Sequence, residues 1–345
     1  MRSRSWWSGV AVMVVAVMVV AVGCGGGDRG SGDAANPTTS TSTNRTTTST
    51  EPIADGCEPS KRSGADSPPG DAVGDLPVVR EERTVVDDSR PTEPKPDRPQ
   101  LASPNRTLPL VIMRPGDGGP YPLVVWSHGL GSAGDERNDT LERWASAGYV
   151  VVALTFPLSS RSTDSSDLRN QPADVAFVVE QSRAAAADDS DEMHGVVDGD
   201  CIALAGHSLG GGTTMAAAYD PCCAGIAPDA LVDIAGVLVA DTPNGRLVDM
   251  DPIPTLIVHG DADRTVPYAQ SEQVAASLRG PTWFLTFTGG GHSDMFAPPR
   301  SKVLDAAVVA FLDAQLKGDQ TSLDALPATV ASSGQATLRT PPPSG

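Results

Sequence analysis

The sequence Gly206-His207-Ser208-Leu209-Gly210 constrains the fold more than any other feature of this 345-residue chain. An apolar stretch, residues 202–205, precedes it, and an Ala-rich stretch, residues 209–219, follows it. A serine between such glycines, at a sharp turn from a strand into a helix, sits in a strained and exposed position. A glycine-rich structural turn could contain the same residues, but the strand and helix pattern around them favours a nucleophile. The pattern therefore predicts that Ser208 is a nucleophilic serine at the end of a buried strand.

Apolar runs of strand length alternate with segments of helical character between residues 76 and 317. This alternation is typical of a mostly parallel sheet with helices on both faces. We therefore predict one α/β domain over residues 76–317. The expected strands are residues 83–86, 108–113, 123–126, 149–154, 201–206, 234–240, 254–259 and 283–287, and the expected helices are residues 141–147, 172–187, 209–219, 270–278 and 303–316.

The N-terminal residues indicate export. Residues 1–23 contain Arg2 and Arg4, then an apolar run from Val10 to Val22, which is the pattern of a secretory signal peptide and is short for a membrane-spanning helix. Residues 21–24 resemble the bacterial lipobox, whose cysteine is diacylated and becomes the mature N-terminus. We therefore expect an extracytoplasmic lipoprotein held on the cell membrane through Cys24, or a secreted protein if Cys24 is not acylated.

Two further segments are expected to be disordered. Residues 24–75 are rich in Gly, Thr, Ser and Pro and have little apolar content, so we predict a disordered tether after the lipidated cysteine. Residues 318–345, which end in a Pro-rich stretch, are predicted to form a disordered tail.

Charge and motif content exclude several classes of partner. The formal net charge of −18 argues against binding to nucleic acid, which needs a basic surface. The sequence contains no phosphate-binding loop, no dinucleotide-binding glycine motif after an early strand and no histidine pair at metal-binding spacing. We therefore expect no cofactor and no metal, and we expect a monomer.

A serine hydroxyl is a weak nucleophile and needs a base. Of the five histidines, His292 lies in a glycine-rich loop after the last expected strand, at the edge of the sheet where Ser208 is expected. His128, His194, His207 and His259 are expected to have structural or surface roles. An acid must orient the base, and Asp261 and Asp263 both follow the expected strand 254–259.

Four stretches, residues 123–132, 206–212, 259–267 and 289–292, resemble the α/β-hydrolases. The likeness covers residues 80–316 and is to the branch that includes dienelactone hydrolases, platelet-activating-factor acetylhydrolases and bacterial polyester hydrolases. This resemblance implies an α/β-hydrolase fold. It implies that Asp263, just before the Val266-Pro267 step, is the acid, and that Asp261 is a turn residue. It also implies that the backbone N–H groups of Leu130 and Leu209 bind the oxyanion.

Together these features predict a serine hydrolase that cleaves carboxylic esters through an acyl-enzyme intermediate. The substrate would be a small-molecule ester or a polymer. One alternative is a polyester or cutinase-like hydrolase with the same chemistry. Another is a catalytically inactive hydrolase fold that serves as a binding protein of the cell envelope.

Export would place four cysteines in an oxidising compartment. A strand rises from Cys201 to the serine motif, and the following helix returns Cys222 and Cys223 to about the level of Cys201. Four cysteines, Cys57, Cys201, Cys222 and Cys223, allow three pairings, and we predict a disulfide from Cys201 to Cys222 or Cys223.

The two segments that could hold a lid are short or polar. Residues 241–253 contain two prolines and an Asn-Gly turn, which leaves too little chain for a helical hairpin, and residues 157–168 are rich in Ser, Thr and Asp. We therefore expect no large cap domain and an open, shallow cleft over the serine.

Overall fold

The computed structural model describes Cys57 and residues 74–160, 164–219, 223, 225–237 and 252–342. The chain divides into two units, Met1–Ile53 and Ala54–Gly345, and all the described residues belong to the second. The predicted signal peptide, Cys24 and Cys222 lie outside the described residues. None of the helices in the described ranges is long and apolar enough to cross a membrane.

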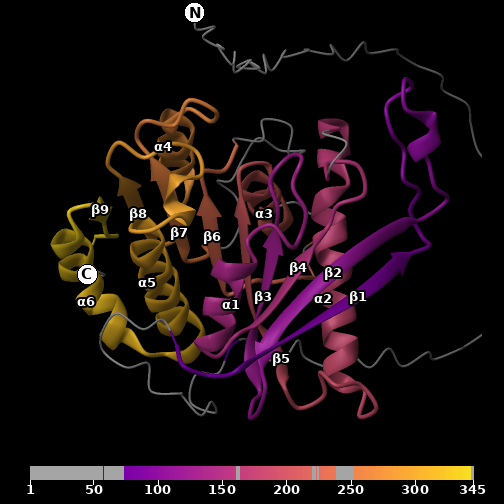
Figure 1. The fold of residues 1–345 in the computed structure, drawn as a ribbon, viewed down its shortest axis with the longest axis horizontal. Helices are drawn as coiled ribbons and strands as arrows, with labels where there is room; N and C mark the ends of the chain where they lie inside the picture. The colour runs from indigo at the N-terminus through magenta and orange to yellow at the C-terminus, as the bar shows by residue number, and fades with distance from the viewer. Residues whose placement is uncertain are drawn as a thin grey trace, which may run out of the picture. The chain divides into compact units, whose positions relative to one another are not determined.

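Within the described residues, nine strands form one sheet in the order β1-β2-β4-β3-β5-β6-β7-β8-β9 (Figure 1). The neighbouring strands from β4 and β3 across to β8 are parallel, whereas β1 with β2, β2 with β4 and β8 with β9 are antiparallel. The strands are β1 Val78–Asp87, β2 Arg106–Pro115, β3 Tyr121–Ser127, β4 Val150–Leu154, β5 Val197–His207, β6 Ala230–Ile234, β7 Thr255–Gly260, β8 Thr282–Phe287 and β9 Ala336–Arg339.

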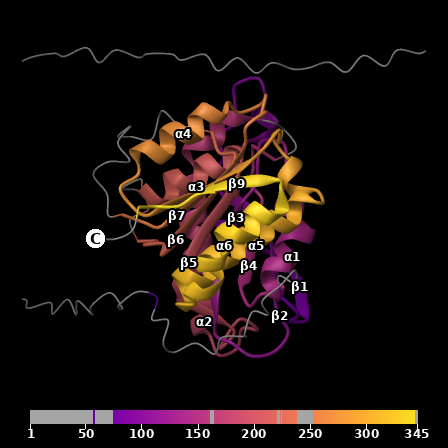
Figure 2. The same cartoon turned by 90° about the vertical axis from the view of Figure 1, so that its left-hand side faces the viewer.

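Helices cover both faces of this sheet, with α3 and α4 on one side and α1 and α5 on the other (Figure 2). Because both faces are covered, the residues of the central strands are buried on both sides of the sheet instead of alternating between buried and exposed: every residue of β4, β6 and β7 is buried. This architecture confirms the predicted α/β-hydrolase fold. The helices are α1 Asn138–Ser146, α2 Gln171–Ala187, α3 Leu209–Tyr219, α4 Tyr268–Ser277, α5 Arg300–Leu312 and α6 Gln320–Ser333, and a π-helical turn, Asp313–Lys317, continues α5.

The prediction of a disordered tail over residues 318–345 is wrong for the residues that are described, because residues 318–342 contain α6 and β9. Leu323, Leu326 and Val330 are buried at helical spacing, in the same apolar cluster as α5. Strand β9 pairs with β8 and covers what would otherwise be an open sheet edge. The Ser, Thr and Pro content of this segment concealed its apolar period.

The strand predicted at residues 234–240 is displaced, since β6 is Ala230–Ile234. A buried aspartate, Asp233, interrupts the apolar sequence within this strand, and the uninterrupted apolar run that follows it resembles a strand more closely. Residues 235–237 lie beyond the end of β6, and residues 238–240 lie outside the described part of the chain.

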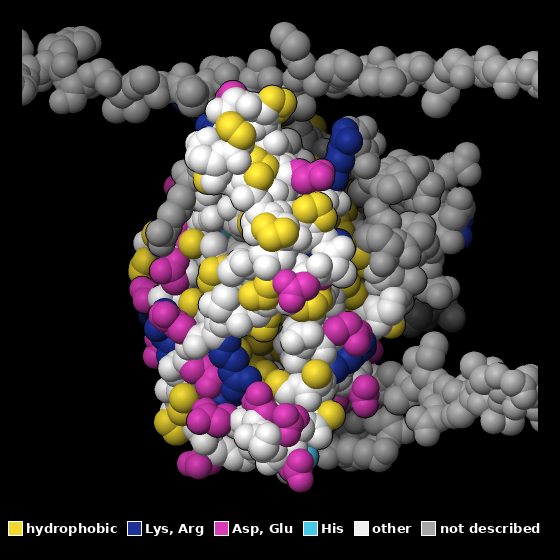
Figure 3. Space-filling view, turned by 90° about the vertical axis from the view of Figure 1, so that its right-hand side faces the viewer, with side chains coloured by type: hydrophobic (Ala, Val, Ile, Leu, Met, Phe, Trp, Pro, Cys, Tyr) yellow, Lys and Arg dark blue, Asp and Glu magenta, His cyan; other side chains and the backbone are white. Residues whose placement is uncertain are grey.

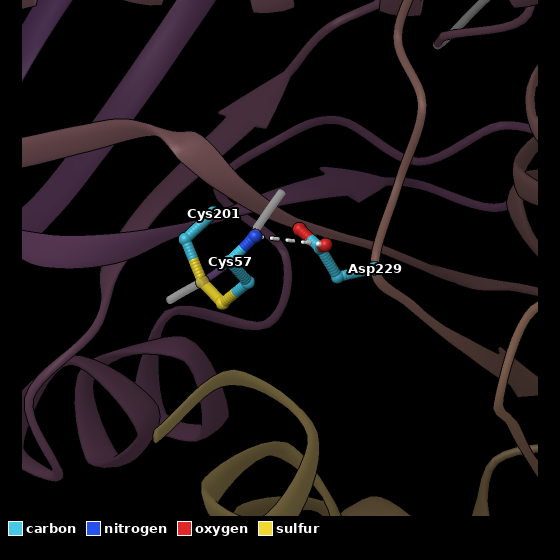
Figure 4. Close-up of side chains that lie close together, drawn as sticks. All are labelled: Cys57, Cys201 and Asp229. Carbon is cyan, nitrogen blue, oxygen red and sulfur yellow. Dashed lines mark hydrogen bonds between the residues drawn. A yellow bond between two sulfur atoms is a disulfide. The ribbon is translucent and has the colours of Figure 1, made fainter. Parts of the chain in front are cut away.

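The predicted partner of Cys201 is wrong: Cys201 forms a disulfide with Cys57 (Figure 4). The side chain of Cys201 belongs to the apolar cluster on the α5 face of the sheet, whereas Cys223 belongs to the cluster on the α3 face. The sheet therefore separates the two cysteines, even if they lie at similar positions along the strand direction. Cys223 is itself disulfide-bonded.

The prediction that residues 24–75 are disordered also fails at Cys57. Besides its disulfide, this residue donates its backbone N–H to the carboxylate of Asp229 at 3.4 Å (Figure 4). It also packs against the apolar cluster on the α5 face. The cysteine therefore fastens part of the predicted tether to the folded domain.

Figure 3 shows the face of this unit on the side of β1, where acidic and basic side chains are interspersed in the lower half. Two arginines of β1 form ion pairs: Arg80 with Glu82 at 2.9 Å, and Arg83 with Asp191 at 2.7 Å. The exposed pair of Arg80 with Glu82 contributes at most about 1 kcal/mol to stability.

Candidate active site

Ser208 lies at the turn between β5 and α3, with a backbone φ of 58°. This left-handed conformation is strained for a residue with a side chain, and it is held by a hydrogen bond from Ser208 N–H to the carbonyl of Ile234 at 2.9 Å. The flanking glycines are required for packing: a Cβ atom on Gly210 would collide with the backbone of Ser127, and one on Gly206 with the backbone of Gly210. The serine motif therefore forms the sharp strand-to-helix turn that its sequence predicts.

His292 lies in the loop after β8 and joins Ser208 to Asp263. Its Nε2 atom is 2.9 Å from Oγ of Ser208, and its Nδ1 atom is 2.7 Å from Oδ2 of Asp263. Because a carboxylate can only accept a hydrogen bond, Nδ1 carries the hydrogen and Nε2 is free to accept the serine hydroxyl. The three side chains that the sequence singled out thus form one continuous hydrogen-bonded chain.

The carboxylate of Asp263 is completely buried. Burial alone would raise its pKa, but hydrogen bonds from His259, His292 and the backbone N–H of Thr265 outweigh this effect and hold the pKa of Asp263 well below its usual range. Asp263 therefore stays ionised next to His292.

Asp261 has a different environment. Its Oδ1 atom accepts the backbone N–H of Gly289 at 2.6 Å, so it ties the end of β7 to the loop that carries His292. Of the two candidate acids, the structure brings Asp263 to the imidazole and leaves Asp261 as an exposed turn residue.

The loop after β3 passes close to the serine. A Cβ atom on Gly129 would lie 3.3 Å from Cβ of Ser208, and Leu130, the next residue, is exposed at 38%. Leu209 begins α3 on the other side of Ser208. Both predicted oxyanion donors, Leu130 and Leu209, are therefore in segments that flank the hydroxyl.

His128 braces this loop. Its Nε2 atom accepts the backbone N–H of Phe156 at 3.0 Å, so its Nδ1 atom carries the hydrogen and donates to the carbonyl of Gly129 at 2.7 Å. Burial lowers the pKa of His128 to about 4. The residue is thus a fixed, neutral support, in agreement with its expected structural role.

Two histidines contact the site in ways that the sequence did not reveal. His207 lies 3.0 Å through Nε2 from the carbonyl oxygen of His292, and burial, followed by the charge of His292, lowers its pKa to about 3. His259 contacts Asp263 at 3.0 Å. The spacing of four residues between His259 and Asp263, across the turn that ends β7, was the available signal, because it lets both side chains meet.

One group of potential metal ligands occurs among the described residues: Cys57, Cys201 and Asp229. The two sulfur atoms are bonded to each other. Asp229 accepts the backbone N–H of Cys57 at 3.4 Å and that of Ile202 at 2.9 Å. This arrangement uses the ligand atoms for structure and not for a metal ion.

The models of two protein families match overlapping parts of this chain: Chlorophyllase over residues 86–247 and the Prolyl oligopeptidase family over residues 243–319. Among curated proteins, YfhR of Salmonella typhi, an uncharacterized protein, is 29% identical over 142 residues, which cover 33% of this chain and 48% of the relative. YfhR of Escherichia coli (strain K12) is 28% identical over 80 residues, which cover 23% of this chain and 28% of the relative. The chain thus spans about half or less of the length of these relatives.

The two family matches together include the serine turn and the segments that carry Asp263 and His292. The branch of dienelactone, platelet-activating-factor and polyester hydrolases stays a prediction. The sheet has the α/β-hydrolase fold, and the two family matches indicate a member of the α/β-hydrolase superfamily.

Proposed function

We propose that this protein cleaves carboxylic esters through an acyl-enzyme formed on Ser208. The observation that carries the proposal is the unbroken chain of hydrogen bonds from Ser208 through His292 to a buried, ionised Asp263. A serine, an imidazole and a carboxylate in this order are the groups that acyl transfer to a hydroxyl requires.

In the first half of the proposed reaction, Oγ of Ser208 attacks the carbonyl carbon while Nε2 of His292 takes the hydroxyl proton. The negative charge moves to the carbonyl oxygen, where the N–H groups of Leu130 and Leu209 donate to it. His292 then gives its proton to the departing alkoxide, and the acyl group stays on Ser208. Asp263 keeps its negative charge throughout and stabilises the imidazolium of His292.

In the second half, water replaces the alcohol. His292 removes a proton from a water molecule as it attacks the acyl carbon, and the resulting tetrahedral intermediate expels Ser208. His292 returns the proton to the serine oxygen, which completes the cycle without a cofactor.

A peptide substrate has the weaker support from the family matches, because the match that carries a peptidase name does not include the proposed nucleophile. The match to the Chlorophyllase family includes Ser208, Leu130 and Leu209. The match to the Prolyl oligopeptidase family begins at residue 243 and includes Asp263 and His292 but not the serine. A polyester hydrolase would use the same residues on a polymer, which the expected open cleft would admit.

Trapping of the acyl-enzyme tests this proposal. The protein is mixed with p-nitrophenyl butyrate, quenched in acid within the burst and digested, and the peptides are analysed by mass spectrometry. We expect a butyryl group on the peptide that contains Ser208, and none on that peptide in the Ser208→Ala variant. A parallel assay with a peptide p-nitroanilide distinguishes esters from amides. Faster turnover of the anilide would mean that the protein is a peptidase and would overturn the ester proposal. A protein that acylates no residue would support the inactive binding protein instead.

We also propose that the mature protein is attached to the outer side of the cell membrane through diacylated Cys24 and acts as a monomer. The support is the basic, apolar and small-residue order of residues 1–24. Metabolic labelling with a palmitate analogue tests this point, since wild type should incorporate the label and the Cys24→Ala variant should not.

A further inference from the structure

The carboxylate of Asp263 is held between two imidazoles. Its Oδ2 atom lies 2.7 Å from Nδ1 of His292 and 3.0 Å from Nε2 of His259. Its Oδ1 atom accepts the backbone N–H groups of Thr265 at 2.7 Å and Val266 at 3.0 Å. The backbone thus fixes one oxygen, and His259 and His292 share the other.

The surroundings of His259 fix its tautomer. Its Nε2 atom is also 3.1 Å from the carbonyl oxygen of Val266, and neither a carbonyl nor a carboxylate can donate, so Nε2 carries the hydrogen. Its Nδ1 atom lies 2.6 Å from Oγ of Ser271, whose hydroxyl can donate to it. A neutral imidazole with hydrogen on Nε2 satisfies all these contacts. The side chain is completely buried, so water does not compete for them.

We propose that His259 is a positioning residue that holds the Asp263 carboxylate in line with His292 and shares its negative charge. The inference rests on the serine hydrolase function proposed above and deepens it. His259 transfers no proton: the proton of Ser208 moves to Nε2 of His292, and the hydrogen on Nε2 of His259 stays in place.

The second imidazole changes how strongly Asp263 holds the imidazolium of His292. With two side-chain donors on Oδ2, the negative charge is divided between them. Without His259, the carboxylate would interact more strongly with His292. Its Oδ2 atom could also move out of line with His292, because the backbone N–H groups hold only Oδ1. The imidazolium of His292 would then be bound more strongly by Asp263 and would transfer its proton less readily to the leaving group.

Other titratable groups face these residues from neighbouring elements. Tyr268 of α4 places its ring edge-on to His259, with 5.7 Å between ring centroids, and the His207 ring lies 4.8 Å from that of His292. Asp233 of β6 interacts electrostatically with His259, and burial raises the pKa of Asp233 to about 6. Ionisation of Asp233 would therefore contribute to a pH profile near neutrality, and the test must remove that contribution.

Two amide substitutions test the inference as a matched pair. In His259→Gln, the longer side chain can bring an N–H donor to the position of Nε2, whereas in His259→Asn the shorter one reaches only the position of Nδ1. We expect His259→Gln to keep kcat within about tenfold of wild type. We expect His259→Asn to lose about 10- to 100-fold in kcat with little change in KM, because a hydrogen bond to a charged group is lost.

The pH dependence separates positioning from a general loss of packing. In His259→Asn the acidic limb of the kcat/KM profile, which reports deprotonation of His292, should move to higher pH, and in His259→Gln it should stay near that of wild type. The same difference should persist in an Asp233→Asn background, where the titration of that carboxyl is removed. Circular dichroism and thermal melting establish that each variant is folded.

A less disruptive substitution, Ser271→Ala, tests the inference if His259→Asn does not fold. Ser271→Ala keeps the imidazole and removes its partner on Nδ1, so Nε2–H becomes a weaker donor to Asp263. We expect a smaller loss of kcat and a shift of the acidic limb in the same direction. Equal kcat in the two amide variants, or a folded His259→Asn variant whose acidic limb stays with that of wild type, would overturn the role of His259 while leaving the proposed function intact. A wild-type protein that hydrolyses no ester would overturn both.

Discussion

Cys57 is joined by a disulfide to Cys201, 144 residues further along the chain. Cys201 begins the buried part of β5, the strand that ends at the serine motif. The bond therefore connects a segment before the first strand to the central strand of the sheet.

Cys57→Ser should lower the free energy of unfolding by about 2–5 kcal/mol, since the open chain gains conformational freedom when it unfolds. Thermal melting under non-reducing conditions measures the change. Cys201→Ala should cost a similar amount, and the double variant should cost little more than either single one. Additive losses would mean that the two cysteines stabilise the fold separately.

Asp263→Asn should reduce kcat far more than Asp261→Asn. The first substitution removes the charge that orients Nδ1–H of His292, and a loss of roughly 10⁴-fold is typical when such a carboxylate is replaced. The second affects a hydrogen bond to the backbone of Gly289. Steady-state kinetics on one ester compare the two variants, and the opposite order would assign the acid to Asp261.

Asp233 makes stability depend on pH. It is buried next to Gly211 and Gly236, and its Oδ1 atom has no hydrogen-bond partner in the described part of the chain. Burial raises its pKa to about 6, from 3.8 in the unfolded chain. The folded state therefore binds the proton of Asp233 more tightly than the unfolded chain does. The stability that this proton contributes is full below pH 3.8 and is lost as the pH rises through about 6.

Asp233→Asn should remove this loss. At pH 8 the free energy of unfolding of the variant should be about 1–3 kcal/mol higher than that of wild type. At pH 4 the two free energies of unfolding should be similar. Urea unfolding at the two pH values measures the difference. A variant that is less stable at both pH values would mean that the ionised carboxylate has a partner that stabilises it.

Activity on p-nitrophenyl esters should be greatest for short acyl chains and should not rise when the substrate begins to form micelles. The reason is the absence of sequence suited to a helical lid in residues 157–168 and 241–253. Part of each segment lies outside the described residues, so the open cleft stays a prediction. A sharp rise at micelle formation, with preference for long chains, would indicate a lid.

The fold and the proximity of Ser208, His292 and Asp263 could be predicted because each depends on local sequence. The serine motif specifies a strand, a turn and a helix by itself, and in a parallel sheet the loops after β7 and β8 open at the same edge. Asp263 and His292 could therefore be found from their position after a strand, without knowledge of distant contacts.

What the sequence did not predict depends on contacts between distant segments. The disulfide partner of Cys201 could be predicted only from the face of the sheet on which each cysteine lies. The position of each cysteine along the strand direction was not sufficient. Strand β9 has a short, mostly polar sequence that forms a strand because the edge of β8 accepts it. The contact of His259 with Asp263 depends on how the chain turns after Gly260.

Fluorophosphonate labelling of wild type and of Ser208→Ala tests whether Ser208 is the nucleophile. We predict that wild type carries the label on Ser208 and that the folded variant carries none. Ester hydrolysis by the variant should fall by about 10⁴- to 10⁶-fold in kcat, because the three residues act as a unit. Label that persists in Ser208→Ala, or a folded wild type that takes up none, would contradict the claim.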